Sequence, residues 1–310
     1  MQFSALKYFI ETVRLGSIRR AGEVLYVAPS AVSRQIAILE QKFGAPLFER
    51  HAAGMRLTPA GEVFAMQARA TLRDFERLQA QIDDLQQLRR GLVRIAAVEA
   101  IIPGLLYPAI REFRKSYPGI EYEVRVLGSV KVLMAVAHEE CDIGLAFEPG
   151  EQAEVTEDSA FIDPVVAVMP PNHPLAHRKS LTIRELAKHR LAMLDDSHST
   201  CALVNRAFAK EGLKPQVDIT LSHVGVTAAY AREGLGLTFL PSLAARADQR
   251  AGRVKLARID DALFQGTRFV LCRHKTRPLT LSAQAFLGAL RLQFAQQVLR
   301  KPRRPSKPRK

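Results

Sequence analysis

The pattern of apolar and polar positions divides the chain into a helical front part and a longer part in which strands alternate with helices. In residues 3–15 and 29–43 apolar side chains recur at spacings of three and four, which predicts amphipathic helices. Later apolar runs, such as 92–98, 142–147 and 165–169, alternate with helical stretches, as is typical of a parallel sheet covered on both faces. The pattern therefore predicts an all-α-dominated front domain followed by an α/β domain.

Residues 16–61 contain two short predicted helices joined by a tight turn. Ser17 can cap a helix from Ile18 to about Leu25, since its side-chain oxygen can accept a bond from a free backbone N–H. Pro29 suits the first position of the next helix, where its missing N–H costs nothing. The apolar residues of that helix are expected to face the core: Val32, Ile36, Leu39 and Phe43. Two such helices predict a helix-turn-helix arrangement.

The outward face of the second helix carries short hydroxyls, a bidentate cation and an amide, which are Ser30, Ser33, Arg34 and Gln35. Such side chains read base edges and bind phosphates in a major groove. Arg19 and Arg20 in the first helix add cations that raise phosphate affinity, whereas Gly22 in the same helix costs about 1 kcal/mol relative to Ala. The pattern favours a DNA-binding domain, and an ordinary helical bundle with a polar outer face is the alternative for this stretch alone.

A two-stranded wing is predicted behind the second helix. Residues 46–50 suit a short strand, 51–55 a turn that contains glycine, and 56–58 the returning strand. Arg50 and Arg56 flank the expected wing tip, where a winged helix meets the sugar-phosphate backbone or a minor groove. These two arginines therefore join the predicted DNA contacts.

The front of the chain resembles the LysR-type transcriptional regulator family, densely over residues 1–65 and more loosely to about residue 299. The segments that carry the resemblance include Gly16-Ser17, Ser30-Ala31-Val32-Ser33-Arg34-Gln35-Ile36, Leu39-Glu40, Leu47-Phe48 and Leu57-Thr58. One departure is Ile18-Arg19-Arg20-Ala21-Gly22, where family members have a polar-aromatic pattern before a small residue at position 22.

The resemblance implies a sequence-specific DNA-binding transcriptional regulator that binds an inverted-repeat operator in double-stranded DNA. It also implies a two-lobed, periplasmic-binding-protein-like α/β effector domain, in which a small-molecule effector of unknown identity modulates DNA binding or activation. The implied assembly is a homodimer that forms a homotetramer, and RNA polymerase is a further candidate partner.

A long linker helix is expected from Pro59 to about Arg89, with Thr58 as its cap. Its apolar positions step by four and three residues over three heptads: Phe64, Ala68, Thr71, Phe75, Leu78, Ile82 and Leu85. This pattern predicts a coiled-coil seam with a second copy, so that a homodimer presents two reading helices to a two-fold operator. An amphipathic helix packed on its own domain is the alternative.

The domain organisation follows from these elements. We predict a winged helix-turn-helix domain in 1–58, a linker and dimerisation helix in 59–90, an effector-binding domain in 91–299 and a basic disordered tail in 300–310. Lobe 1 of the effector domain would comprise about 91–162 and 269–299, and lobe 2 about 163–268. Crossing strands near 163–168 and 266–270 would form the hinge.

The predicted effector site lies between the two lobes, because ligands of open α/β sheets bind beyond the carboxyl ends of strands, near helix N-termini. The candidate residues are Glu99, Ala100, Phe147, His198, Ser199, Thr200, Val226 and Thr227. Family members often carry Ser or Thr where this chain has Glu99; the carboxylate favours a cation, an amine or a hydrogen-bond donor as effector. A salt bridge from Glu99 to an arginine is equally compatible. Asp195, Asp196, Ser197 and Ser199 could instead serve only as caps and turns.

Charge and cysteine usage refine this picture. About half of the formal charge of +14 falls in residues 300–310, which hold seven Lys or Arg and no acid. A solvated tail and salt-sensitive, non-specific binding to DNA are both compatible with that composition.

Cys141, Cys201 and Cys272 are far apart, which predicts reduced thiols, and a redox-sensing pair is the alternative.

The sequence predicts neither a membrane span nor export. No run of 18 apolar residues exists. Lys7 and Glu11 interrupt the apolar block that a signal peptide needs. We therefore expect a cytoplasmic protein without a membrane partner.

Motifs that carry enzyme chemistry are missing from the sequence. It has no Gly-rich GK[ST] loop, no G-x-S-x-G and no H-E-x-x-H. Gly234 and Gly236 lack the third glycine of a dinucleotide fingerprint, and His173 and His177 lie in a proline-containing loop. We therefore predict no enzyme, no catalytic residue, no metal site and no cofactor.

Two non-enzymatic functions compete with the regulator. A solute-binding protein for transport would share the two lobes, but the basic front end and the absence of an export signal argue against it. An architectural DNA-binding protein with a non-responsive sensor domain also fits the sequence. A ligand-dependent change in the DNA footprint would separate it from a responsive regulator.

Overall fold

The computed structural model describes residues 3–51, 54–84 and 90–299. The chain divides into two compact units: residues up to 86, together with 138–140, form the first, and the remaining residues form the second. Each unit has its own buried apolar core. None of the described helices combines the length and apolar character that crossing a lipid bilayer requires. The predicted basic tail, 300–310, lies outside the described residues.

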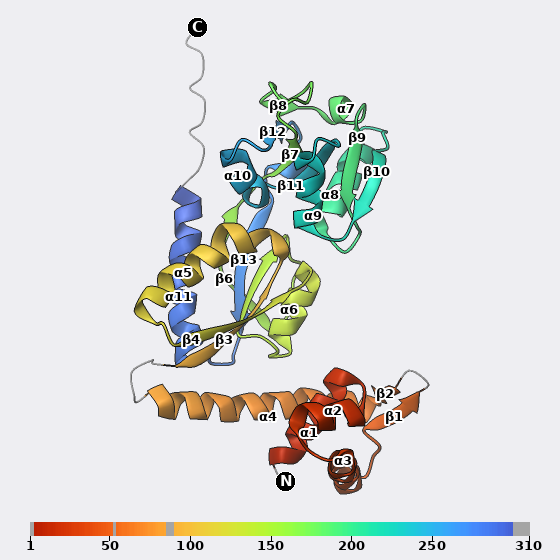
Figure 1. Cartoon of the computed structure of the whole chain (residues 1–310), viewed down its shortest axis with the longest axis vertical. Helices are drawn as coiled ribbons and strands as arrows, with labels where there is room; N and C mark the ends of the chain where they lie inside the picture. Colours follow the sequence, from red (N-terminus) through yellow and green to blue (C-terminus); the bar gives the residue numbers. More distant parts are fainter. Residues whose placement is uncertain (1–2, 52–53, 85–89, 300–310) are drawn as a thin grey trace. The chain divides into compact units, whose positions relative to one another are not determined.

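The first unit begins with three helices: α1 (Phe3–Leu15), α2 (Ile18–Leu25) and α3 (Pro29–Phe43) (Figure 1). The side-chain oxygen of Ser17 accepts a hydrogen bond from the backbone N–H of Arg20, which confirms the predicted cap. Tyr26 takes a left-handed conformation with φ of 55° and ends α2. Pro29 begins α3, as predicted. Local chain signals therefore set both ends of the turn between α2 and α3.

Helix α3 buries one apolar face in the core of the first unit. Val32, Ile36 and Leu39 are buried, as predicted. The prediction is wrong for Phe43, which is 51% exposed and lies with its ring centroid 5.0 Å from that of Phe64. Phe43 is the last residue of α3, so its ring sits at the margin of the core rather than inside it.

The wing is an antiparallel hairpin of β1 (Phe48–His51) and β2 (Gly54–Leu57), so the strands begin and end a few residues from the predicted positions. Oε1 of Glu40 accepts hydrogen bonds from the backbone N–H groups of Leu47 and Phe48, at 2.8 and 3.2 Å. Since Glu40 belongs to α3, this carboxylate ties the wing to that helix. Residues 52–53, at the wing tip, lie outside the described residues.

The long helix α4 (Pro59–Asp84) follows the wing. The hydroxyl of Thr58 accepts a hydrogen bond from the backbone N–H of Gly61 at 3.0 Å, which confirms the predicted cap. Along the predicted heptads, Phe64 is half-buried and Ala68 is buried, whereas Thr71, Phe75 and Leu78 are exposed. The side chain of Ile82 and the whole of Leu85 lie outside the described part of the chain. The helix thus leaves an apolar stripe uncovered beyond its first turns.

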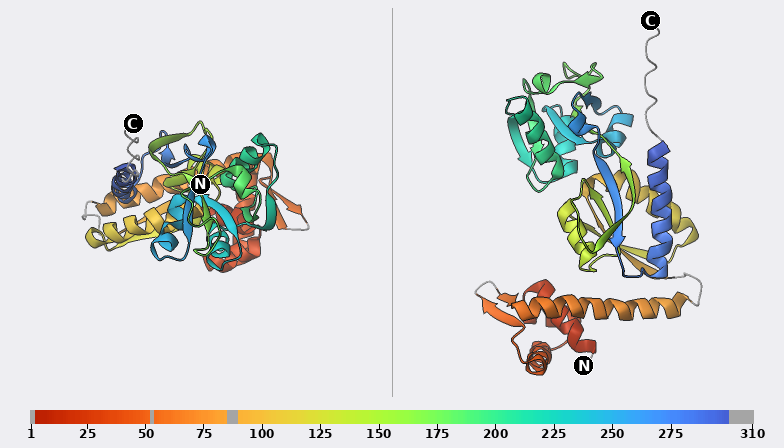
Figure 2. Two further views of the ribbon diagram at one scale, coloured as in Figure 1. Left: turned by 90° about the horizontal axis from the view of Figure 1, so that it is seen from above. Right: turned by 180° about the vertical axis from the view of Figure 1, so that it is seen from behind.

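Lobe 1 of the second unit is a five-stranded sheet in the order β4-β3-β5-β13-β6. Its strands are β3 (Gly91–Ala97), β4 (Ile120–Val126), β5 (Ile143–Phe147), β6 (Val155–Ile162) and β13 (Arg268–His274), of which β3, β4 and β5 are parallel. Helix α6 (Ser129–Ala137) packs with Val270 and Cys272 of β13. Helices α11 (Leu281–Leu299) and α5 (Tyr107–Ser116) pack into the larger apolar core on the other face, so helices cover both faces of the sheet (Figure 2).

Lobe 2 is a six-stranded sheet in the order β10-β9-β11-β7-β12-β8. Its strands are β7 (Val165–Met169), β8 (Ser180–Leu181), β9 (Arg190–Leu194), β10 (Gln216–Leu221), β11 (Leu237–Pro241) and β12 (Lys255–Ile259). Its helices are α7 (Ile183–Leu186), α8 (Ser199–Lys210), α9 (Val224–Arg232) and α10 (Ser242–Arg250). Strands β9, β10 and β11 are parallel, so their carboxyl ends meet at one edge of the sheet.

The two lobes are joined where the chain crosses between the sheets, near Asp163 and Thr267. The backbone N–H of Asp163 donates to the Thr267 carbonyl at 2.9 Å, and the Thr267 hydroxyl donates to the Asp163 carbonyl at 2.6 Å. The buried Asp163 carboxylate also accepts bonds from the Ser242 hydroxyl, the Leu243 N–H and the Arg246 guanidinium. Burial raises the pKa of Asp163 above its ordinary value, and these three donors oppose the rise. The crossing strands are thereby fixed to α10 of lobe 2.

Ser129 and Gly91 fix two element boundaries of lobe 1. The Ser129 hydroxyl donates to the carbonyl of Phe147 at 2.5 Å and so ties α6 to β5. Gly91 is the first residue of β3. A β-carbon on Gly91 would lie 2.9 Å from the side chain of Ser282, which explains the glycine. Strand β6 and helix α10 were not predicted.

Candidate DNA-binding face and effector pocket

In the described residues, the outward face of α3 is exposed and could contact a partner. Ser30, Ser33 and Arg34 are exposed and Gln35 is half-buried. Within the described residues Arg34 forms no hydrogen bond or ion pair. Since guanidinium groups are usually satisfied by a carboxylate, a carbonyl or a phosphate, this free guanidinium suits an external acceptor such as a base edge or a phosphate.

The predicted phosphate contacts lie on α2 and on the wing of the first unit. Arg19 and Arg20 lie exposed on α2, and Arg19 forms an exposed pair with Glu23, with 3.2 Å between Nε and Oε1. Arg56 is exposed on β2, where it pairs in register with Glu49 of β1. Arg50 belongs to β1, but its side chain lies outside the described part of the structure. Exposed pairs of this kind are weak, so Arg19 can exchange Glu23 for a phosphate.

A cavity of about 160 Å³ lies between the two lobes of the second unit. Six of the eight predicted effector residues line it: Glu99, Ala100, Phe147, His198, Ser199 and Thr200. The structure does not support the other two. Thr227 is buried and its hydroxyl donates to the His223 carbonyl at 2.8 Å, and Val226 is 53% exposed away from the cavity lining.

Other residues that line the cavity were not predicted, although they too lie at the carboxyl ends of strands. Ser222, His223 and Val224 follow the carboxyl end of β10, and 127–129 follow that of β4, whose last residue, Val126, also lines the cavity. The predicted residues came from the ends of β3, β5 and β9 and from the helix after β10, but none came from the end of β4 and none of the three that directly follow β10 was named. The rule that ligands lie beyond strand ends would have found them from the sequence.

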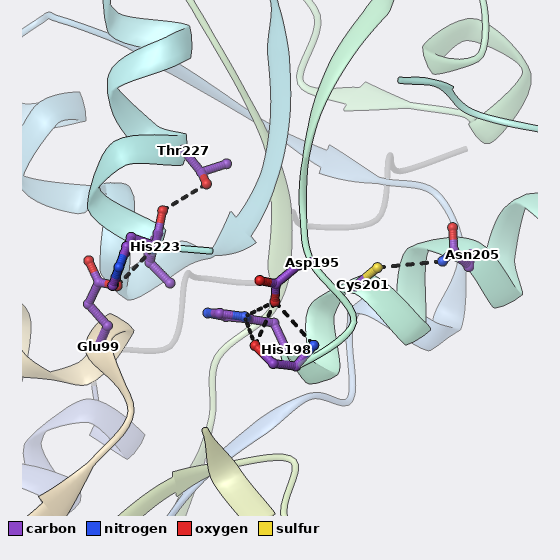
Figure 3. A network of polar contacts seen from close by, with 9 residues as sticks. Glu99, Asp195, His198, Cys201, Asn205, His223 and Thr227 are labelled. Atoms are coloured by element: carbon purple, nitrogen blue, oxygen red, sulfur yellow. Dashed lines mark hydrogen bonds and ion pairs between the residues drawn. The ribbon is translucent and has the colours of Figure 1, made fainter. Parts of the chain in front are cut away.

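Glu99 lines the cavity and contacts the opposite lobe (Figure 3). Its Oε2 accepts a hydrogen bond from the Val224 N–H at 2.8 Å, and its Oε1 accepts one from the Gly225 N–H at 2.7 Å. The His223 Nδ1 lies 3.6 Å from Oε2. The alternative in which Glu99 forms a salt bridge with an arginine is therefore wrong, because the carboxylate caps the first turn of α9.

A second polar cluster lies on lobe 2 at the start of α8. Oδ1 of Asp195 accepts bonds from the Ser197 N–H and hydroxyl, at 3.1 and 2.6 Å, and lies 3.2 Å from His198 Nδ1 (Figure 3). The bond from the Ser197 hydroxyl, together with His198, holds the pKa of Asp195 below its ordinary value. Asp195 and Ser197 thus form the turn that the alternative interpretation expected. The Ser199 hydroxyl instead reaches across the cavity to the Phe147 carbonyl, at 3.4 Å.

None of the three cysteines, all of which the structure describes, forms a disulfide bond. Burial raises the pKa of Cys272 to about 12, and burial is also the main cause that raises the pKa of Cys201. Cys141 is buried. Because the thiolate is the form that oxidants attack, these environments disfavour the redox-sensing pair that the cysteine count left open.

Two family models match most of the chain. Residues 3–62 match the model of the bacterial regulatory helix-turn-helix protein, lysR family, and residues 86–295 match that of the LysR substrate binding domain. Among curated relatives, the hca operon transcriptional activator HcaR of Escherichia coli is 30% identical over 243 residues, which cover 78% of this chain and 82% of HcaR. The transcriptional dual regulator GltC of Bacillus subtilis is 29% identical over 78% of this chain and 81% of its own length.

Solved structures share the fold over most of the chain. A full-length OxyR cysteine variant from Pseudomonas aeruginosa has a TM-score of 0.71 at 22% identity and covers 94% of this chain and 95% of its own. Full-length CbnR, solved as a complex with its target DNA, has a TM-score of 0.66 at 19% identity and covers 94% of this chain and 100% of its own. The likeness supports a winged helix-turn-helix followed by a two-lobed α/β domain.

Proposed function

Because the chain belongs to the LysR family of bacterial transcriptional regulators, it is a DNA-binding regulator whose activity a small-molecule effector modulates, and we propose how its residues divide that task. The outward face of α3 reads the operator, exposed arginines of α2 and the wing hold its phosphates, and the cavity between the lobes binds the effector. The observation that carries the proposal is the free, exposed Arg34 on a helix whose opposite face is buried.

The base-reading role falls to Ser30, Ser33, Arg34 and Gln35, near the N-terminal end of α3. Residues in this part of a recognition helix contact base edges in the major groove. Arginine binds guanine in a bidentate manner, and glutamine binds adenine in the same way. Arg19, Arg20, Arg50 and Arg56 supply charge that fixes register on the duplex without specifying sequence. These assignments are supported by the exposure of all described side chains except the half-buried Gln35.

The protein assembles as an oligomer, and α4 is the proposed seam between two copies. Phe75 and Leu78 are 42% and 50% exposed on the predicted heptad positions. A stripe of this kind is stabilised when a second copy covers it. Two copies related by a two-fold axis would present two α3 helices to an inverted repeat.

A tetramer requires a second interface, and the second unit offers apolar surface for it. Val130 and Met134 on α6 are 69% and 46% exposed, and Val217 and Ile219 on the edge strand β10 are 47% and 40% exposed. An exposed edge strand with apolar side chains readily pairs with another surface. We assign these two surfaces to contacts between dimers.

Effector binding would act through the angle between the lobes. The crossing at Asp163 and Thr267 is a short, hydrogen-bonded segment, while the cavity walls belong to separate sheets. A ligand that binds one angle more tightly shifts the population toward that angle. The packing of effector domains in the oligomer, and hence the spacing and bend of bound DNA, would change with it. RNA polymerase would then meet a differently placed regulator.

One observation supports the alternative function, an architectural DNA-binding protein. Glu99 and Ser199 already hold the two lobes together across the cavity, as expected for an architectural DNA-binding protein with a non-responsive sensor. We further propose a cytoplasmic location, because a bacterial transcription regulator acts where the chromosome is.

One experiment tests both functions with the full-length protein. Duplexes selected from a random library should converge on an inverted repeat, and a footprint of the selected operator should change when a binding metabolite is added. Metabolites are first screened by their effect on melting temperature. Failure to select any sequence would contradict the regulator. A footprint that no stabilising metabolite alters would support the architectural protein instead.

A further inference from the structure

Helix α9 receives its cap from the opposite lobe. Its N-cap residue, His223, makes no capping hydrogen bond with its side chain. The first N–H groups of a helix lack partners within the helix and attract anions. In this protein they meet the carboxylate of Glu99, which stands 125 and 126 residues earlier in the chain than its partners Val224 and Gly225.

The fit between Glu99 and α9 is close. Both carboxylate oxygens are engaged, each by one N–H at 2.7 or 2.8 Å. A β-carbon on residue 225 would lie 3.1 Å from Oε1 of Glu99, tighter than an ordinary contact, so the glycine lets the carboxylate approach. This is the arrangement expected for a bound carboxylate ligand, except that the carboxylate belongs to the protein.

The rest of the cavity offers an anionic ligand little compensation. None of the described residues that line it is a lysine or an arginine. Its titratable lining residues are Glu99, His198 and His223, and the His198 ring is engaged by Asp195 and Ser197. A second carboxylate that entered this small space would face the negative charge of Glu99 without a fixed cation beside it.

We propose that Glu99 is a tethered ligand that fills the anion subsite of the cleft and thereby sets effector specificity. The wild-type cavity rejects small carboxylates and accepts a small ligand that carries hydrogen-bond donors and no carboxylate. Since Glu99 begins the turn after β3 in lobe 1 and α9 belongs to lobe 2, the same contact holds the lobes together. The inference rests on the proposed function to the extent that it assigns the effector to this cavity.

Removal of the tethered carboxylate tests the proposal directly. In full-length Glu99→Ala, the subsite at the N-terminus of α9 is vacant and should accept free acetate. Acetate should then raise the melting temperature saturably, by about 2–4 °C, because a ligand that binds the folded state stabilises it by mass action. Wild-type protein should show no saturable rise at the same acetate concentrations. Sodium chloride at matched ionic strength and neutral acetamide are the controls.

A second variant guards against a trivial loss of structure. Glu99→Gln keeps the size of the side chain and one oxygen acceptor, so the subsite stays filled and acetate should stabilise this variant no more than wild type. An equal acetate response in wild type and Glu99→Ala would overturn the proposal, as would the absence of a response in a folded Glu99→Ala protein. A response of Glu99→Gln that equals that of Glu99→Ala would also overturn it.

The result of the acetate titration does not depend on whether the proposed function is correct. The acetate titration needs no DNA, and the operator selection uses the wild-type chain. A protein that selects no operator but shows the acetate response only in Glu99→Ala would refute the regulator and keep the tethered ligand. Operator selection without that response would refute the tethered ligand and keep the regulator.

Discussion

The carbonyl oxygen of Val27 lies 2.8 Å from the position that a β-carbon on Gly22 would occupy. The Val27 N–H also donates to the Gly22 carbonyl at 3.0 Å. The chain that leaves α2 therefore folds back onto Gly22 before it enters α3. The glycine that weakens α2 as an isolated helix is what allows the tight turn of the helix-turn-helix.

The substitution Gly22→Ala has two opposing effects on stability: higher helix propensity and a steric clash with the backbone of Val27. Propensity alone would stabilise the first unit by about 1 kcal/mol, whereas the crowding against backbone costs about 1–3 kcal/mol. We expect net destabilisation, measured as a lower free energy of unfolding in urea. Gly288→Ala in α11 is the matched control, since no atom lies within 4 Å of its β-carbon, and it should stabilise by about 1 kcal/mol. A stabilising Gly22→Ala would contradict the contact.

Elements with local signals were predictable from the sequence. Ser17 and Pro29 mark helix starts through their own chemistry, and each acts within a few residues. The apolar run of β7 also sufficed to place that strand. Strand β6 was missed because its middle, Thr156 to Ser159, is polar and gains its place only by pairing with β13. Helix α10 follows β11 directly, and its start was signalled only by Pro241 and Ser242, a signal that the reading of the sequence did not use.

Partners that are distant in sequence were not predictable. The Ser129 hydroxyl suits a cap by type and position, yet it bonds to Phe147, 18 residues away. Glu99 was identified as informative, but its partners on α9 depend on how two lobes meet. The rule that ligands bind beyond the carboxyl ends of strands selects the region of the site. It does not say which side chains in that region already form hydrogen bonds with other parts of the protein.

Asp158 gives the stability of lobe 1 a pH dependence. Its nearly buried carboxylate, on β6, accepts a bond from Nε of Arg291 on α11 at 2.7 Å. The Arg291 hydrogen bond is the main cause that lowers the pKa of Asp158 from its ordinary 3.8. The unfolded state thus binds the proton more readily, so this contribution to stability is full above about pH 4 and is lost as the pH falls through the native pKa.

Asp158→Asn should therefore lower the free energy of unfolding by about 1–3 kcal/mol at pH 7. The difference from wild type should shrink as the pH falls below 4, in urea denaturation at a series of pH values. Asp260→Asn is the control: its partner Arg258 and Asp260 itself are both 58% exposed, and such a pair contributes little. A difference between Asp158→Asn and wild type that stayed constant down to pH 3 would contradict the assignment.

Leu78→Glu should weaken the dimer. Leu78 is 50% exposed on the predicted seam of α4, and a carboxylate there would have to be buried against a second copy without a partner. We expect the sedimentation coefficient to shift toward smaller species at micromolar concentration. Leu292→Glu is the matched control, because it places the same charge on a 66% exposed leucine of another helix, α11. If both variants sediment like wild type, α4 is not the seam.

Arg34→Ala tests the reading face. Loss of a guanidinium that meets a base edge or a buried phosphate should cost about 1–3 kcal/mol, or about 5- to 150-fold in operator affinity. Fluorescence anisotropy with the selected operator and a scrambled duplex measures both affinity and specificity. Lys42→Ala removes the same charge at the other end of α3, so it should weaken both duplexes alike and mainly at low salt. Arg34→Ala should reduce preference for the operator, and unchanged preference would assign Arg34 to phosphate contact alone.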